Sequence, residues 1–406
     1  MASHVSVIGL GYMGLPMAAI LATSGHKVTG VDINPHVVTS VNNGQCPFAE
    51  PGMPELVAQA HQSGNLVAVT KPVPAEIFIL SLPTPVDHTT HEADMSFVEA
   101  AAASIAPVLN GGELVMLEST SPMGATRKCV KGVIESLRPD LTDKIDYVFS
   151  PERAIPGTTL KEMVGNDRLI GGVTPQAAAR AKQLYSSFCT GQLLEATVEE
   201  AEMVKVVENA SRDVQIAFAN ELSMVCERLG LDVWRIIKLA NHHPRVNILR
   251  PGAGVGGHCL AVDPWFIINS APELTPLMQA TRSVNDIKPF WVTEQIRKVS
   301  ENIGRKPVVA CLGLAYKPDV DDLRESPSIT VVNELIKQGY ELRVVEPHLT
   351  SWQQPLHALE DAVTQSDIVV TLTGHKAFQS LPQGALKGKH ILDIAGIYLT
   401  RPELSQ

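Results

Sequence analysis

Apolar runs and glycine turns alternate along the first 32 residues. An apolar run at residues 4–8 is long enough for a buried strand and too short for a helix. A glycine-rich turn at residues 9–14 follows, and then an Ala/Leu/Met-rich stretch, residues 15–24, that Gly25 ends. A second apolar run covers residues 27–32. This pattern predicts a βαβ unit, in which a helix connects two parallel strands.

The same alternation continues through the first half of the chain. Further short apolar runs predict buried strands at residues 77–82, 114–119, 146–150 and 169–173, with helical patterns between several of them. Strands that alternate with helices imply a parallel sheet with helices on both faces.

The pattern becomes helical near residue 197. Thr197 and Glu200 fit a capping box, and no strong helix breaker occurs before Gly230, so we expect one long helix with apolar stripes. More helical sequence follows at residues 233–240 and 277–301, with a Gly/Pro-rich stretch at residues 244–264 between them.

A second α/β segment begins after residue 306. Strands are expected at residues 308–312, 341–345, 368–372 and 390–394, with a helix at residues 329–338. The chain therefore predicts two Rossmann-like, doubly wound parallel-sheet domains joined by a central helical region. We place the domains at residues 1–196, 197–302 and 303–406.

Composition and charge narrow the class of protein. Of the 406 residues, 45% are hydrophobic and 19% are charged, which is typical of a folded protein of two or three domains. The net charge of −10 argues against nucleic acid or an anionic membrane as a partner. No apolar run approaches the roughly 18–20 residues of a membrane span, no cleavable leader is evident, and the six cysteines lack zinc-type or disulfide-framework spacing. We expect a cytoplasmic protein with reduced thiols and no metal site.

The first glycine turn has the context of a dinucleotide-binding fingerprint. The segment Gly9-Leu10-Gly11-Tyr12-Met13-Gly14 follows a predicted strand and opens a predicted helix, whose N-terminus attracts phosphate. Asp32, at the end of the second strand, is placed to accept hydrogen bonds from a ribose and to repel a 2′-phosphate. The alternative is a glycine turn used only for packing, and the complete set of elements favours NAD instead.

Two later loops are expected to close over the same ligand, because open sheets bind at the carboxyl ends of their strands. They contain Thr84, between two prolines, and Thr120, within a Ser/Thr/Pro segment. Simple turn chemistry explains the same residue types equally well.

The segment from Pro251 to Pro264 contains the best candidate nucleophile. Four glycines within six residues allow close backbone approach to a ligand, and Cys259 lies in this loop. The default interpretation, a buried inert thiol, suits Cys129, Cys189, Cys226 and Cys311, which lie in ordinary apolar or helical sequence. On the long helix, Lys205, Asn209 and Arg212 share one face, and by spacing alone a solvated polar face explains them.

Taken together, these motifs resemble the UDP-glucose/GDP-mannose dehydrogenase family over the whole chain. The resemblance is carried by the glycine fingerprint, Ser150-Pro151-Glu152-Arg153, Lys205 with Asn209-Ala210, Gly256-Gly257-His258-Cys259, and Tyr316-Lys317-Pro318 through Asp322-Leu323-Arg324-Glu325-Ser326-Pro327. His258 before the cysteine and Ala261-Val262-Asp263 after it, with His243-Pro244-Arg245 upstream, depart from the UDP-glucose enzymes. They resemble the branch that oxidises UDP-N-acetylmannosamine, with UDP-N-acetylglucosamine enzymes as the nearest competitor.

The resemblance implies a four-electron oxidation of the C6 alcohol of a UDP-N-acetylhexosamine to a carboxylate, with two NAD⁺ in succession. Cys259 would capture the intermediate aldehyde as a thiohemiacetal, which becomes a thioester and is hydrolysed. UDP-N-acetylmannosamine is the predicted substrate, and UDP-N-acetylglucosamine and UDP-glucose are the alternatives. The C2 stereochemistry of the sugar stays open.

The same resemblance implies residue roles. Lys205 and Asn209 would assist acid/base chemistry at C6, Asp263 would orient Lys205 or a water, and Glu152 would guide the hydrolytic water. Arg324 would reach the cofactor. The sugar nucleotide would contact Arg153, Ala154, Arg212, His243, Arg245, Gly256, Tyr316 and Lys317 as well as Lys205 and Asn209. The central helices would form a homodimer interface, although apolar stripes can equally cover a domain core.

Two rival functions remain to be weighed. A two-electron β-hydroxyacid dehydrogenase needs neither a nucleophilic cysteine nor a second α/β domain, and both are predicted here. A non-catalytic sensor of NAD or nucleotide sugar would be signalled by a missing cysteine or lysine, and Cys259 and Lys205 are both present.

Overall fold

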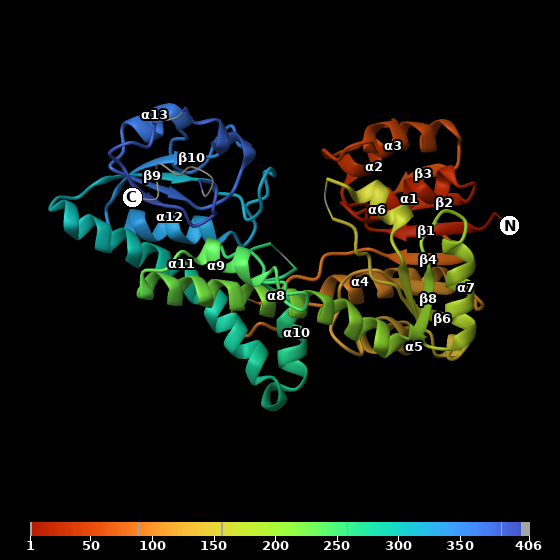
Figure 1. Cartoon of the computed structure of the whole chain (residues 1–406). Helices are drawn as coiled ribbons and strands as arrows, with labels where there is room; N and C mark the ends of the chain where they lie inside the picture. Colours follow the sequence, from red (N-terminus) through yellow and green to blue (C-terminus); the bar gives the residue numbers. More distant parts are fainter. Residues whose placement is uncertain (1, 88, 156, 258, 383, 399–406) are drawn as a thin grey trace. The chain divides into compact units, whose positions relative to one another are not determined.

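The computed structural model describes residues 2–87, 89–155, 157–257, 259–382 and 384–398 (Figure 1). Its contacts divide the chain into two units, Met1–Glu208 with Trp265–Ser270, and Asn209–Pro264 with Ala271–Gln406. Each unit is built around one sheet and is described by itself. The three-domain boundaries given above stay a prediction.

The sheet of the first unit has eight strands in the order β3-β2-β1-β4-β5-β6-β7-β8. These are β1 (His4–Ile8), β2 (Lys27–Val31), β3 (Leu66–Val69), β4 (Ile77–Leu80), β5 (Leu114–Leu117), β6 (Asp146–Phe149), β7 (Arg168–Gly172) and β8 (Leu193–Thr197). The order places β1 and β4 side by side at the centre, so the carboxyl ends of these two strands form the topological switch point.

One pairing differs from the predicted all-parallel sheet. β6 and β7 pair antiparallel through Val148 with Gly172 and Phe149 with Gly171. The connection between these strands contains only the seven-residue helix α6 (Thr159–Gly165), and it does not run back along the sheet. The chain consequently enters β7 from the end at which β6 finishes.

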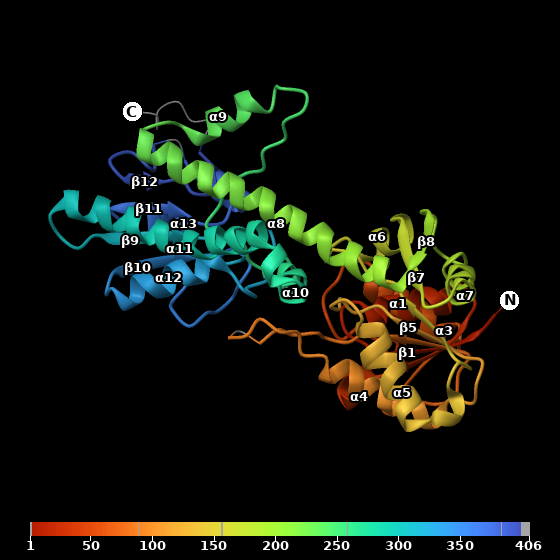
Figure 2. The same ribbon diagram turned by 90° about the horizontal axis from the view of Figure 1, so that it is seen from below.

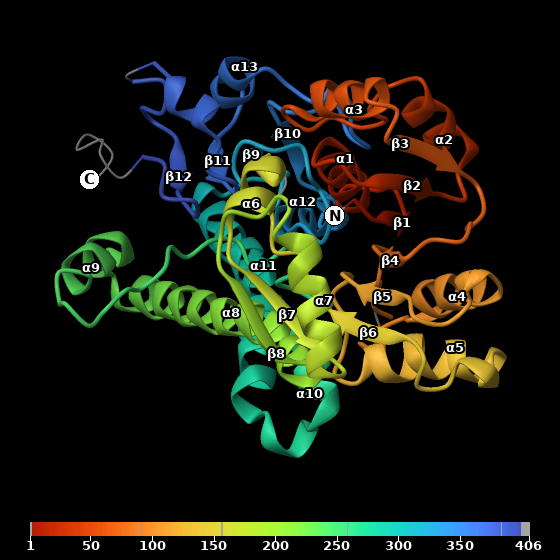
Figure 3. The ribbon, with the colours of Figure 1, turned by 90° about the vertical axis from the view of Figure 1, so that its right-hand side faces the viewer.

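Helices cover both faces of this sheet, as predicted (Figure 3). One core gathers apolar residues of α1 (Gly14–Thr23), α3 (Met53–Gln62) and α7 (Pro175–Tyr185), and α2 (Pro35–Asn42) packs at its edge. The other core gathers residues of α4 (Ser96–Ile105), α5 (Gly132–Leu137) and the start of α8. The central strands β4 and β5 are buried on both sides, which explains their almost entirely apolar sequences.

The long helix α8 (Val198–Leu229) begins at the predicted capping box and runs without interruption (Figure 2). The backbone N–H of Thr197 donates to Glu200 Oε2 at 2.8 Å, and the N–H of Glu200 donates to Thr197 Oγ1 at 3.3 Å. Residues 198–208 belong to the first unit and residues 209–229 to the second. A short helix, α10 (Asp263–Ser270), also has residues in both units.

The second unit contains an all-parallel sheet in the order β10-β9-β11-β12. Its strands are β9 (Val308–Leu312), β10 (Glu341–Val345), β11 (Ile368–Thr371) and β12 (His390–Leu392), and its remaining helices are α9 (Val233–Ala240), α11 (Pro276–Ile303), α12 (Pro327–Lys337) and α13 (Leu359–Thr364). Alternate residues of β9 enter two different cores, one against α11 and α12 and one against α13. Two Rossmann-like sheets with a helical segment between them in sequence confirm the predicted fold class.

The described residues contain no helix with the length and apolar character that a bilayer span requires.

Within the second unit, α8 and α11 share a buried polar contact. Lys288 on α11 is 1% exposed, and its Nζ lies 2.6 Å from Ser223 Oγ on α8 and 3.7 Å from the centre of the Trp291 ring. Burial lowers the pKa of this lysine to about 7.

Replacing Lys288 by methionine should change how stability depends on pH. The pKa of the amine is about 7 in the folded chain and 10.5 ordinarily, so between these values the unfolded chain binds more protons. The free energy of unfolding of the wild type, relative to Lys288→Met, should therefore rise from pH 7 to pH 10, by an amount on the order of a few kcal/mol. Denaturant unfolding at several pH values measures this, and parallel profiles for the two proteins would contradict it.

Candidate active site

The glycine turn after β1 has the geometry that dinucleotide binding requires. Gly9 adopts φ +92°, and a Cβ there would lie 2.3 Å from the Ser81 carbonyl oxygen, while a Cβ on Gly14 would lie 1.9 Å from the Gly9 carbonyl oxygen. A Cβ on Gly11, by contrast, would have no described atom within 4 Å, which leaves open space where backbone meets a phosphate. The turn therefore fits the predicted cofactor.

Asp32 directly follows β2 and holds this turn. Its Oδ2 accepts the backbone N–H of Leu10 at 2.9 Å, and its Oδ1 accepts that of Asn34 at 2.8 Å. The next residue, Ile33, is 90% exposed, and Tyr12 is 54% exposed with its ring 4.4 Å from that of Phe48.

The two Ser/Thr loops predicted to line the cofactor lie together. Thr84 Oγ1, after β4, donates to the carbonyl oxygen of Thr120, after β5, at 2.7 Å. Ser119 Oγ also accepts the backbone N–H of Leu82 at 2.8 Å. Both loops follow neighbouring strands at the carboxyl edge of the sheet, which is where the sequence placed them.

Glu152, after β6, has both carboxylate oxygens engaged. Oε1 accepts the backbone N–H groups of Arg153 and Ala154 at 2.7 and 2.8 Å, and Oε2 accepts Nη2 of Arg168 at 2.5 Å. The carboxylate thus fixes the conformation of the loop that contains the predicted sugar contacts Arg153 and Ala154.

A buried cluster beneath these loops escaped sequence reasoning. Arg168 stacks on Tyr185, 4.5 Å from the ring centre, and the Tyr185 hydroxyl donates to Glu118 Oε1 at 2.7 Å. Burial raises the pKa of Glu118 to about 7, although the nearby Arg168 opposes the rise. The only signal in the sequence was a polar residue directly after the buried strand β5.

Lys205 and Arg153 have different surroundings in the first unit. Arg153 Nη1 pairs with Glu208 at 2.7 Å and Nη2 donates to the Asp167 carbonyl oxygen. Lys205 is only 8% exposed, and the described residues give its ammonium no hydrogen bond or ion pair. A nearly buried ammonium without an acceptor suits a group whose partner is a ligand.

In the second unit, glycine allows the turn of the predicted nucleophile, residues 256–257 and 259–263 (called here the nucleophile turn), to lie directly on the turn after β9. A Cβ on Gly256 would lie 2.7 Å from Cβ of Tyr316 and 2.6 Å from the Glu325 carbonyl oxygen. Gly257 adopts φ +82°, its Cβ position lies 2.9 Å from the Tyr316 ring, and its N–H donates to the Arg324 carbonyl oxygen at 3.0 Å. Only glycine fits at these two positions, and Cys259 follows two residues later. His258 lies outside the described residues.

Cys259, Asp263 and Asn209 are linked. The backbone N–H of Asp263 donates to the Cys259 carbonyl oxygen at 2.8 Å, which closes the turn that opens α10. The buried Asp263 carboxylate accepts Asn209 Nδ2 at 2.6 Å. Three of the predicted catalytic residues therefore lie in one hydrogen-bonded group.

Tyr316 and Arg324 adjoin the same turn. Burial raises the pKa of Tyr316, and the charges of Asp322 and of a Cys259 thiolate add to this. Arg324 binds the Asp322 carboxylate through Nε and Nη2 at 2.6–3.1 Å, a pairing that raises the pKa of the guanidinium. The remaining predicted contacts of this unit are exposed side chains, namely Lys317, Arg212, His243 and Arg245.

Four of the other thiols, Cys46, Cys129, Cys226 and Cys311, fit the inert interpretation. All six cysteines are free. Burial raises the pKa of Cys129 to about 11 and of Cys311 to about 12, and it also raises those of Cys46 and Cys226. A thiol with a raised pKa is rarely ionised and is a poor nucleophile.

The turn after β9 is held by the carboxylate of Glu346, which directly follows β10. Asp32 holds the turn after β1 in the same way in the first unit. Glu346 Oε2 accepts the N–H groups of Leu314 and Ala315 at 2.7 and 3.0 Å, as Asp32 does for Leu10. Sequence reasoning missed Glu346, whose position directly after β10 matches that of Asp32 after β2.

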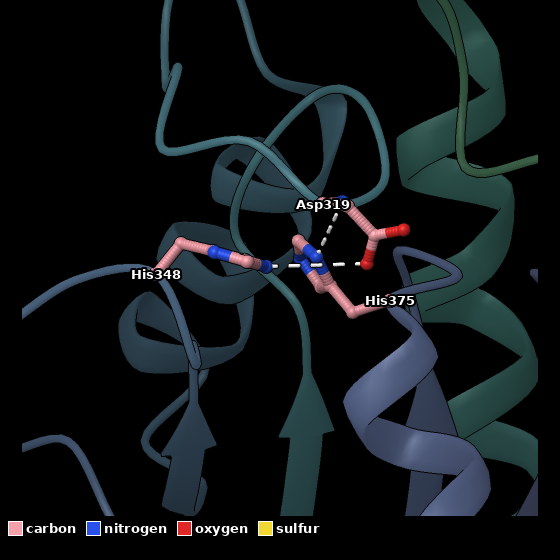
Figure 4. A group of neighbouring side chains, drawn as sticks. All are labelled: Asp319, His348 and His375. Atoms are coloured by element: carbon pink, nitrogen blue, oxygen red, sulfur yellow. Dashed lines mark hydrogen bonds and ion pairs between the residues drawn. The ribbon is translucent and has the colours of Figure 1, made fainter. Parts of the chain in front are cut away.

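Asp319, His348 and His375 bring donor atoms within 4.8 Å of one another, close enough for a metal ion (Figure 4). His375 Nδ1 already accepts the Asp319 N–H at 2.9 Å, and its Nε2 lies 3.1 Å from Glu346. The Asp319 carboxylate pairs with Lys376 at 3.2 Å. A metal ion would compete with each of these bonds. The expectation that the protein has no metal site stays a prediction.

Comparison with known proteins agrees with this geometry. Three models of the UDP-glucose/GDP-mannose dehydrogenase family match the chain: the NAD binding domain over residues 3–189, the central domain over residues 199–287 and the UDP binding domain over residues 310–400. An NDP-N-acetyl-D-galactosaminuronic acid dehydrogenase of Ralstonia nicotianae is 45% identical over 97% of this chain and 96% of its own length. A UDP-N-acetyl-D-mannosamine dehydrogenase of Yersinia pestis is also 45% identical, over 97% of this chain and 99% of its own.

Solved structures agree as well. A UDP-D-ManNAc dehydrogenase from Pyrococcus horikoshii superposes with a TM-score of 0.89 at 36% identity, covering 97% of this chain and 96% of its own. The family models together span most of the sequence, and NAD is the cofactor of the first domain. The chain therefore belongs to the UDP-glucose/GDP-mannose dehydrogenase family.

Proposed function

We propose that this protein oxidises the C6 alcohol of UDP-N-acetylmannosamine to the carboxylate by covalent catalysis at Cys259. The observation that carries the proposal is the nucleophile turn. Gly256 and Gly257 place it directly against Tyr316, and the turn closes on Asp263, which binds Asn209. An inert core thiol needs none of these features.

NAD⁺, when bound at the glycine turn after β1, is the oxidant. Two NAD⁺ molecules are used per sugar, and each accepts one hydride. Cys259 adds to the C6 aldehyde that the first oxidation leaves, and the aldehyde oxygen gains a proton to give a thiohemiacetal. The second oxidation converts the thiohemiacetal into a thioester. Water then adds to the thioester carbon, the C–S bond breaks, and the acid is released with the thiol restored.

Lys205 serves the C6 oxygen in this scheme. Its nearly buried ammonium stabilises negative charge on that oxygen and exchanges a proton with it. Asn209 assists at the same oxygen, and Asp263 holds Asn209 by the 2.6 Å hydrogen bond.

Glu152 guides the hydrolytic water in our proposal, but its geometry limits how it does so. Three donors occupy its oxygens, namely the N–H groups of Arg153 and Ala154 and the Arg168 guanidinium. A carboxylate so engaged orients a water by accepting one further hydrogen bond more readily than it takes up a proton.

Cationic and backbone groups of the second unit bind the sugar nucleotide in this proposal. Tyr316 and Lys317 lie after β9, at the carboxyl end of an inner strand of the second sheet, where nucleotides bind in such folds. We assign Arg324 to the cofactor, and the exposed Arg212, His243 and Arg245, with Gly256, to the sugar and phosphates. A local gathering of cations binds a polyanion despite the net charge of −10.

A second substrate has support from the relatives. The two 45% identical proteins are named for N-acetylmannosamine and for N-acetylgalactosaminuronic acid. UDP-N-acetylgalactosamine is therefore the second candidate, and UDP-N-acetylglucosamine and UDP-glucose remain weaker alternatives. A sensor without catalysis has no use for a nucleophile turn of this construction.

A panel of UDP-sugars incubated with the purified protein and NAD⁺ tests the function. We expect UDP-N-acetylmannosamine to be oxidised with two NADH formed per sugar and the uronic acid as product. One NADH per sugar would indicate a two-electron dehydrogenase, and no turnover of any member would favour the sensor.

Cys259→Ser should retain substrate binding and lose net acid formation, with kcat reduced by more than roughly 1,000-fold, because the thioester no longer forms. Cys189→Ser, in the first unit, is the matched control and should retain activity. Full turnover by Cys259→Ser would remove the covalent step from the proposal.

We also propose a homodimer in the cytoplasm. The apolar side chains Phe218, Val225 and Leu229 of α8 and Ile287 and Phe290 of α11 are exposed, and a partner would cover them. Six free thiols suit a reducing compartment. Light scattering should give twice the chain mass of 43.7 kDa, and a monomer at micromolar concentration would contradict the dimer.

A further inference from the structure

We propose that Glu202 is a positioning residue that joins the helix of Lys205 to the cofactor-side loop after β5. Glu202 is fully buried on α8. Its Oε2 accepts the backbone N–H of Gly124 at 2.6 Å, and its Oε1 accepts that of Thr126 at 2.9 Å. The inference rests on the proposed role of Lys205.

The two N–H groups need this acceptor. Gly124 adopts φ +83° at the end of the loop, and Thr126 begins the π-helical segment η2 (Thr126–Lys131), where the first N–H groups have no partner within the helix. Buried N–H groups without an acceptor are costly, and a carboxylate forms stronger hydrogen bonds than a neutral oxygen. Glu202 therefore determines where this loop ends.

The helix that presents Glu202 is itself fixed to the sheet. A Cβ on Gly171 of β7 would lie 2.5 Å from Cβ of Ala201 and 2.8 Å from the Thr197 carbonyl oxygen, so the first turns of α8 lie directly on the strand. Ala201 and Val198 are buried there. Glu202 thus extends from a rigid support to the loop.

Glu202 connects two groups of predicted functional residues, one on α8 and one in the loop after β5. Lys205 is three residues after Glu202 and lies on the adjacent turn of the same helix side. The loop that Glu202 holds contains Thr120, which is hydrogen-bonded to Thr84. One carboxylate therefore sets the separation between the acid/base group and two predicted cofactor contacts.

Glu199 offers a matched control. It lies one turn earlier on α8 and pairs with Arg127 of the same π-helical segment at 2.5 Å, but its side chain is 51% exposed. An exposed ion pair of this kind contributes little. Glu199→Gln therefore removes a charge and one contact between the same two elements without touching the buried N–H groups.

The test compares Glu202→Gln with Glu199→Gln. An amide has one acceptor oxygen, and its NH₂ group would face the second backbone N–H, so the loop must shift. We expect Glu202→Gln to raise the Kd for NAD⁺ about 10-fold in a binary titration and to lower kcat roughly 10- to 100-fold. The pH at which kcat is half-maximal should also move, because Lys205 is displaced from the reacting oxygen. Glu199→Gln should stay within about twofold of wild type in each measurement.

Glu202→Asp keeps both acceptor oxygens on a shorter side chain and should give intermediate values. If Glu202→Gln fails to fold cooperatively, Glu202→Asp decides by the same readouts. Wild-type Kd, kcat and pH profile in a folded Glu202 variant would overturn the proposal, as would equal losses in the Glu199 variant. The binary NAD⁺ titration needs no sugar, so it tests Glu202 even if the proposed sugar oxidation is wrong.

Discussion

Carboxylates that accept backbone N–H groups hold the loops at the carboxyl ends of both sheets. Asp32 holds the glycine turn after β1, Glu152 its own loop after β6, Glu202 the loop after β5, and Glu346 the turn after β9. Such loops cannot use helix or sheet partners for their N–H groups, and each buried group left without an acceptor costs on the order of 1–3 kcal/mol. The carboxylates supply those partners and thereby fix the loop geometry.

This constraint explains why the carboxylates and Lys205 have different roles in our proposal. Glu152 and Glu202 are occupied by donors, so their main effect is to place neighbouring groups, whereas Lys205, the proposed acid/base group, has no such partner among the described residues. At the nucleophile turn, close packing rather than a carboxylate fixes the backbone conformation. Gly256 and Gly257 bring the backbone against Tyr316 at distances that no side chain would allow. The covalent capture of an aldehyde that we propose for Cys259 would need such a preset turn, because small displacements of a nucleophile cost large factors in rate.

Local patterns in the sequence predicted much of this molecule. The apolar runs located β1, β2 and β9–β11 to within a residue or two, and Thr197 with Glu200 located the start of α8. A strand was predicted at the position of β7, but its antiparallel direction was not, because apolar runs do not report strand direction. The half-exposed edge strand β8 was not predicted, because it has no such run. The carboxylate contacts were not predictable either. Glu202 and Gly124 are 78 residues apart, and such pairings leave no periodic signal. The glycines in the sequence predicted more of the site, because the fingerprint and the nucleophile turn both need residues without a Cβ.

Native-state hydrogen exchange of the ligand-free wild-type protein tests the role of the carboxylates most directly. The amides of Leu10, Leu314 and Ala315, which donate to Asp32 and Glu346, should exchange at least roughly 10-fold more slowly than the amide of the exposed Lys317 in the same kind of turn. Exchange of those three amides as fast as that of Lys317 would contradict the account, because the loops would then not be set before the ligands arrive.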